Sequence, residues 1–228
     1  MNITWLGQST FVVSSSSGVT VLMDPAGPGT GYTPAPVPGV DLVTISHEHS
    51  DHNNTSLAAG QPQVIHGLAG NDWAKIDQVV KGVRVRAVGT YHDDTNGSQR
   101  GKNAVFILET DGLRLAHMGD LGHPLSEEQA KAIGDVDIVL IPVGGFYTID
   151  GPTAARVLQQ LSPRPKVVIP MHYRTPDLNA SLAGRLGPVE DFTDALGGIA
   201  SVVSAGHSIS VRRDTLPSEC TAMVMAYR

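Results

Sequence analysis

The 228-residue chain has only one cysteine, Cys220, which excludes an internal disulfide framework and a cysteine-rich zinc cluster. Aromatic residues make up only 5% of the chain, so few rings are available for stacking on nucleic-acid bases. Lys and Arg number 16 against 22 Asp and Glu, and the resulting net charge of −6 disfavours a phosphate backbone as partner. We therefore expect a small-molecule substrate and no nucleic-acid partner.

The chain also contains no long apolar run. No stretch approaches the roughly 20 residues that a membrane helix requires, so no membrane partner is expected. The first residues have no basic region, and Gln8 and Ser9 interrupt their apolar character, which argues against a signal peptide. We therefore expect a cytoplasmic protein. Hydrophobic residues at 41% and charged residues at 17% are typical of a folded globular domain.

Short apolar runs bounded by turn residues dominate the chain. Strands are expected at 2–6, 10–13, 19–23, 41–46, 83–90, 104–110, 113–117, 136–143, 166–171, 199–203, 208–211 and 221–226. Helices are expected at 126–134, 152–161 and 189–196. Because hairpins in the first half merge without a linker into alternating strands and helices, we expect one α+β domain over residues 1–228.

Two segments allow two interpretations each. Residues 24–39 are rich in proline and must form a loop, for which a plain surface loop is favoured over a lip on a substrate cleft. The basic run 100–103 is favoured as a solvated turn, and contact with an anionic substrate group is the alternative.

The strongest motif is HEHSDH at positions 47–52, directly after an apolar strand. Residues two apart in an extended segment point to the same side, so His47 and His49 can reach one ion. Asp51 and His52 lie past the turn and can face a second ion. Imidazole and carboxylate ligands suit zinc, and also manganese or iron. A metal site is therefore favoured over a solvated polar turn.

Three further strands end in residues of a ligand type. His92 follows strand 83–90, Asp120 follows strand 113–117, and His172 follows strand 166–171. Each alone is more typical of a surface or capping residue. Together they predict a metal centre assembled at one edge of a sheet.

The motifs HEHSDH (47–52), YHDD (91–94), HMGD (117–120) and MHY (171–173) resemble those of the metallo-β-lactamase-fold hydrolases. The resemblance is closest to the small, insertion-free bacterial hydrolases of the ascorbate-6-phosphate lactonase type. It implies a four-layer αββα sandwich with the metals in a groove above two sheets. It also implies a first metal on His47, His49 and His92, a second on Asp51, His52 and His172, and a bridge between them at Asp120.

The resemblance extends less specifically to residues around the centre. Asp24 is interpreted as orienting a ligand or the loop, and an ordinary turn aspartate is the alternative. His117 is expected to support a ligand or contact the substrate. Further pocket candidates flank ligand-bearing turns, with capping or packing as the alternative for each: His123, Tyr147, Thr148, Tyr173 and Arg174.

The implied activity is hydrolysis by a hydroxide that forms from water at two divalent cations, Zn²⁺ first and Mn²⁺ or Fe as alternatives. Asp51 or Asp120 would accept the proton of the water. A small ester or lactone is the favoured substrate, a phosphodiester is the alternative, and a non-catalytic metal-binding or redox module is the third interpretation. Asp120 and His172 are only 52 positions apart, which leaves no room for the large inserted domain of the family's processive RNA nucleases. A homo-oligomer is compatible with the sequence.

Overall fold

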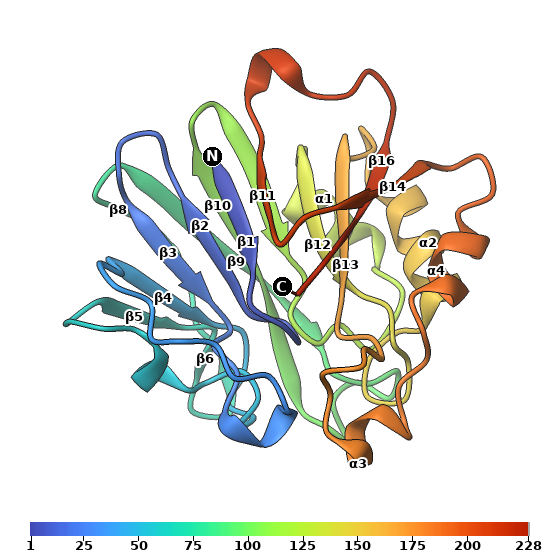
Figure 1. The fold of residues 1–228 in the computed structure, drawn as a ribbon, viewed down its shortest axis with the longest axis horizontal. Coiled ribbons are helices and arrows are strands. Elements are labelled where there is room, and N and C mark those ends of the chain that lie inside the picture. The colour runs from blue at the N-terminus through green and yellow to red at the C-terminus, as the bar shows by residue number, and fades with distance from the viewer. Residues whose placement is uncertain (228) are drawn as a thin grey trace.

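The computed structural model describes residues 1–227, which form two sheets packed face to face (Figure 1). The first sheet has six strands, in the order β15 (Ser208–Ser210), β1 (Asn2–Trp5), β2 (Phe11–Ser14), β3 (Thr20–Met23), β4 (Leu42–Ile45) and β5 (Gln63–His66). Its β3–β4 and β4–β5 pairs are parallel, and the other pairs are antiparallel.

The second sheet has eight strands, in the order β14 (Ser201–Ala205), β16 (Thr221–Met225), β13 (Val167–Met171), β12 (Ile138–Pro142), β11 (Leu113–His117), β10 (Lys102–Thr110), β9 (Val83–Tyr91) and β8 (Asp77–Val80). Strands β8 to β11 are joined by antiparallel pairing, whereas β11 to β14 pair in parallel. A short hairpin pairs β6 (Leu68–Ala69) with β7 (Asp72–Trp73).

Helices cover the outer side of the eight-stranded sheet. Figure 1 shows α2 (Gly151–Gln160) and α4 (Glu190–Ala195) on the side away from the six-stranded sheet, and α1 (Glu127–Ile133) contacts β9. Ser126 begins α1 with a capping box, and Asp150 begins α2 by accepting from the Thr153 N–H. The short α3 (Ala180–Ala183) lies in the loop region after β13. The residues alone predicted only a general α+β arrangement, and that class is confirmed.

The six-stranded sheet buries both of its faces because its central strands are apolar throughout. Along β3, Val21 and Met23 point into the main core between the sheets, while Leu22 points outward. Leu22 packs there with Leu57, which lies in the 3₁₀ turn Thr55–Leu57. Among the residues described, loops and 3₁₀ turns rather than α-helices form most of this outer layer.

Most predicted elements are present with ends shifted by one or two residues. The strands β5 and β8 and the β6–β7 hairpin were not predicted, because their short segments are largely exposed and carry no clear apolar alternation. Helix α3 was also missed, since four residues are too few for a periodic pattern. The longest α-helix in residues 1–227 has ten residues, and none is long and apolar enough to cross a bilayer.

Candidate metal centre

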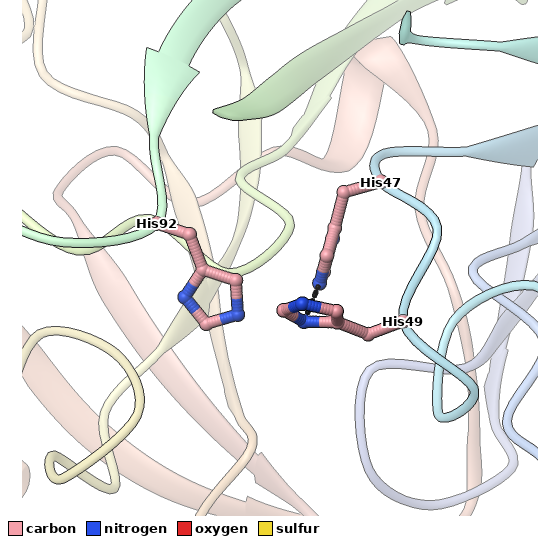
Figure 2. A group of neighbouring side chains, drawn as sticks. All are labelled: His47, His49 and His92. Carbon is pink, nitrogen blue, oxygen red and sulfur yellow. Dashed lines mark hydrogen bonds between the residues drawn. The ribbon is translucent and has the colours of Figure 1, made fainter. Parts of the chain in front are cut away.

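The predicted ligands leave the carboxyl ends of strands from both sheets. The 47–52 turn follows β4, His92 follows β9, Asp120 follows β11 after two residues, and His172 follows β13 directly. Their side chains form two groups, in each of which the potential ligand atoms lie within 4.8 Å of one another. The first group is His47, His49 and His92, and the second is Asp51, His52, Asp120 and His172. Figure 2 shows the three rings of the first group converging from two chain segments.

Asp120 lies at the junction of the two groups. Its Oδ2 atom is 3.1 Å from Nε2 of both His52 and His92, 3.5 Å from His172 Nε2, and 3.8 Å from His47 Nε2. Burial acts to raise the pKa of Asp120, but the surrounding histidines outweigh it and hold this pKa well below its usual range. Asp120 is therefore an ionised carboxylate that faces ligands of both groups.

The first group is suited to bind a cation because two of its histidines, His47 and His49, favour the neutral form. Nε2 of His47 lies 3.0 Å from Nδ1 of His49 (Figure 2). Burial lowers the pKa of His47 well below its usual value, and the neighbouring His52 adds to the effect. Burial and His92 likewise lower the pKa of His49. A neutral imidazole keeps a nitrogen lone pair available for a metal ion.

The second group lies in a negative electrostatic field, which comes from Asp120 and Asp51. Burial lowers the pKa of His52, but the charges of Asp120 and Asp51 outweigh burial and raise this pKa well above its usual value. A field that stabilises a proton on His52 also stabilises a divalent cation at the same place. In addition, Asp120 Oδ1 is buried with no hydrogen-bond partner among residues 1–227, so it can act as a ligand. The donor set, with imidazole nitrogens and two carboxylates, fits Zn²⁺ or Mn²⁺.

Asp24 supports this arrangement from behind. Its Oδ1 accepts the Ser46 N–H at 2.8 Å, and its Oδ2 accepts the Ser46 hydroxyl at 2.5 Å. Oδ2 also lies 2.8 Å from His52 Nδ1, so the ring donates its Nδ1 proton there and directs Nε2 towards Asp120. The Ser46 hydroxyl in turn lies 2.9 Å from His47 Nδ1. One buried carboxylate thus orients two histidines, one from each group.

Two supporting residues were not singled out from the sequence. Asn103, fully buried in β10, accepts the Asp120 N–H at Oδ1 over 3.0 Å, and its amide donates to Met118 O and Thr90 Oγ1. Gln8 donates from Nε2 to Asp51 Oδ2 at 3.3 Å. The only sequence signal for Asn103 is its place directly before an apolar strand. An amide that is buried there requires hydrogen-bond partners.

Gly119 allows the chain to turn towards Asp120. Its φ of +56° is in the left-handed region, and an added Cβ would overlap Asn103 Oδ1 and lie 2.8 Å from the Ser46 Cβ. We expect Gly119→Ala to lower the free energy of unfolding by about 1–3 kcal/mol, measured by urea denaturation. Gly112→Ala is the matched control, because Gly112 has a φ of +68° with open space around it. Equal losses in the two variants would contradict a steric requirement at Gly119.

His117 and His123 are both engaged in the scaffold. The buried His117 donates from Nε2 to Ser9 O at 2.8 Å and accepts the Gly119 N–H at Nδ1 over 3.0 Å. Its contacts therefore support the 117–120 turn, and it does not line the cavity described below. His123 accepts the Tyr91 N–H at Nε2 over 3.0 Å, which stabilises the end of β9 just before His92.

The other pocket candidates are divided between the cavity and the scaffold. Tyr147 lines the cavity. Tyr173 is buried and stacks on Trp5 with ring centroids 5.5 Å apart, and burial raises the pKa of its hydroxyl. The Thr148 hydroxyl donates to Ile149 O, and the Arg174 N–H donates to Gly187 O. These last three residues do not line the cavity.

A cavity of about 940 Å³ opens onto the predicted ligands. Four of them lie on its wall: His49, Asp51, His92 and Asp120. Residues 27–30 and Arg100 also line it, so both segments border the cavity, as their alternative interpretations require. Composition and chain position alone do not show which loops fold towards a cleft.

Comparison with known proteins shows which family the chain resembles. The family model described as the beta-lactamase superfamily domain matches residues 2–172. A UPF0173 metal-dependent hydrolase of Carboxydothermus hydrogenoformans is 29% identical over 231 residues, covering 92% of this chain and 99% of that protein. Another from Thermoplasma acidophilum is 30% identical over 201 residues, covering 78% of this chain and 85% of that protein.

A solved structure agrees in fold and sequence. The crystal structure of a Thermotoga maritima protein, named a candidate Zn-dependent hydrolase of the metallo-β-lactamase superfamily, covers 98% of this chain and 97% of its own. It is 35% identical with a TM-score of 0.76. The predicted metallo-β-lactamase sandwich is thus confirmed, while the resemblance to the ascorbate-6-phosphate lactonase type stays a prediction. The chain belongs to the UPF0173 metal-dependent hydrolase family of the metallo-β-lactamase superfamily.

Proposed function

We propose that the protein hydrolyses a small ester or lactone with a pair of divalent cations, most favourably Zn²⁺ and alternatively Mn²⁺ or Fe. The observation that carries this proposal is the convergence of two ligand groups on Asp120 at the wall of a cavity of about 940 Å³. A cavity of this size suits a small molecule. The first group would hold one cation, the second would hold the other, and Asp120 would contact both.

Bound divalent cations would lower the pKa of water from 15.7 to about 7 and polarise the carbonyl group that is attacked. The side chains then have distinct roles. Asp51 is the candidate proton acceptor, because its carboxylate is 27% exposed at the cavity wall, where a water molecule can reach it. Gln8 donates to Asp51 Oδ2 and holds this carboxylate in place. Asp120 is a poor base, because His172, His52 and His92 hold its pKa well below the usual range.

Metal removal tests the first part of this proposal. We expect a chelator to abolish ester hydrolysis and Zn²⁺ or Mn²⁺ to restore it, because imidazole-rich sites bind these ions well. Ca²⁺, which prefers six to eight oxygen ligands, should not restore activity. Elemental analysis of the active protein should give two ions per chain. Full activity in a protein shown to be metal-free would contradict the proposal.

A substrate panel separates the ester and lactone proposal from its alternative. Lactones, p-nitrophenyl esters and bis-(p-nitrophenyl) phosphate should be compared on the same metal-loaded protein. Turnover of a lactone or ester supports the proposal. Turnover of the phosphodiester alone would instead assign phosphodiesterase activity to the same centre, and binding of metal without any turnover would favour a non-catalytic module.

A further inference from the structure

Arg100 has an unusual place in the cavity. Of the residues in the range 1–227 that line it, Arg100 is the only lysine or arginine. The acidic lining residues are Asp51 and Asp120, which belong to the candidate metal centre. Most other lining side chains are uncharged hydrogen-bonding groups, such as Asn54, Gln99 and Asn179. A ligand in this cavity therefore meets a polar wall with one permanent positive charge.

The guanidinium of Arg100 is held by aromatic rings rather than by a carboxylate. Its Cζ atom lies 5.2 Å from the ring centroid of Tyr147 and 5.6 Å from that of Phe146. No carboxylate oxygen of residues 1–227 lies within 4.0 Å of it, in contrast to Arg84 and Arg213, which form ion pairs on the surface. These cation–π contacts hold the guanidinium beside the two rings and leave its N–H groups available for an anion.

The loop that carries Arg100 is tightly ordered. The Asp93 carboxylate accepts backbone N–H groups from four residues of this loop, at 2.7–3.0 Å: Thr95, Gly97, Gln99 and Arg100. The His92 N–H also donates to Gly101 O at 3.0 Å, which joins the far end of the loop to a candidate metal ligand. The position of Arg100 is therefore set relative to the metal centre before any ligand binds.

The aromatic support is itself unusual. Phe146 is 56% exposed and has a φ of +57°, a conformation that costs energy in a residue other than glycine. A second guanidinium, that of Arg185, lies 5.2 Å from the Phe146 ring centroid and donates to the Tyr147 hydroxyl at 3.0 Å. Strained backbone is frequent at binding sites, and Phe146 contacts both guanidinium groups next to the cavity-lining Tyr147.

We propose that Arg100 binds an anionic group of the substrate, a carboxylate or a phosphate, at a distance from the bond that is cleaved. This proposal rests on the proposed function and narrows it to polar substrates that carry a negative charge beside the ester or lactone. Arg100 is assigned as a residue that determines specificity, and Tyr147 and Phe146 as residues that position it.

A binding experiment tests Arg100 independently of activity. Inorganic phosphate and succinate are titrated into the metal-loaded full chain by calorimetry, and into its Arg100→Met variant. At least one anion should bind the variant about 10-fold to 100-fold more weakly, as expected for loss of a charge-assisted hydrogen bond. The anion that responds identifies the group as phosphate or carboxylate. Arg156→Met removes the same charge on the exposed side of α2 and should leave both affinities unchanged.

A kinetic experiment tests specificity. The ratio of kcat/KM for p-nitrophenyl hemisuccinate to that for p-nitrophenyl acetate should fall at least about tenfold in Arg100→Met and stay constant in Arg156→Met. Unchanged anion affinity in Arg100→Met would overturn the proposal even if esters are hydrolysed. Absence of any ester turnover in the metal-loaded wild type would instead count against the proposed function, and the calorimetry would still decide the role of Arg100.

Discussion

Replacement of Asp120 by alanine should lower kcat/KM by more than about 100-fold and reduce the metal content below two ions per chain. The loss should exceed the 10-fold to 100-fold effect typical of a residue that only supports a ligand. The physical reason is the position of Asp120 Oδ2, within 3.8 Å of Nε2 of four histidines that belong to both groups. Ester hydrolysis rates and elemental analysis on the same sample measure the two effects.

Asp94→Ala is the matched control for this variant. Asp94 is an exposed aspartate two residues after His92, so its loss removes the same charge near the centre without removing a ligand. Its metal content and activity should stay close to the wild type. An Asp120→Ala protein that retains two ions and normal activity would refute the assignment of Asp120 to the centre. Far-ultraviolet circular dichroism should show that both variants are folded.

Asp24→Asn should weaken metal binding by about 10-fold to 100-fold, although Asp24 itself lies behind the ligands. An amide can still accept the Ser46 N–H through its oxygen, but its NH₂ group then faces His52 Nδ1. His52 must accept there, so its proton moves to Nε2 and blocks the nitrogen that faces Asp120. Competition titration with a chelator measures the affinity, and ¹⁵N spectra of the histidine rings report the tautomer.

Asp41→Asn provides the comparison for Asp24. Asp41 lies at the opposite end of β4, where it accepts the Thr20 N–H and pairs with Lys81. This variant makes the same chemical change away from the centre and should bind metal normally. Equal metal affinity in Asp24→Asn and the wild type, with His52 in an unchanged tautomer, would show that Asp24 does not orient the ring.

Much of the fold was predictable because its strands carry strong local patterns. The apolar runs that became β12 and β13 are buried along their whole length, and such runs stand out in a sequence. Asp-Gly is a common sequence for a hairpin turn, and Asp111 and Gly112 both adopt positive φ in the hairpin between β10 and β11. Segments such as β8, with three exposed residues of four, pair because of their neighbours in space and leave little trace in the sequence.

The candidate site was predictable to a similar extent and for a related reason. Ligand types that follow strand ends within a few residues, as His92 and His172 do, can be recognised by position. Asn103 and Gln8 could not be recognised, because each acts through a contact with a residue distant in sequence. The same holds for Arg100, whose aromatic partner Tyr147 lies 47 positions away.

The positions of most strands along the chain and the chemistry of the ligand motifs were thus determined by the sequence, because apolar periodicity and residue type are local properties of the chain. Only the tertiary structure decided which loops line the cavity, that Asp24 orients one histidine of each group, and that Arg100 makes cation–π contacts without a carboxylate partner among residues 1–227. These features depend on distances between segments far apart in the chain, and packing of the two sheets sets those distances.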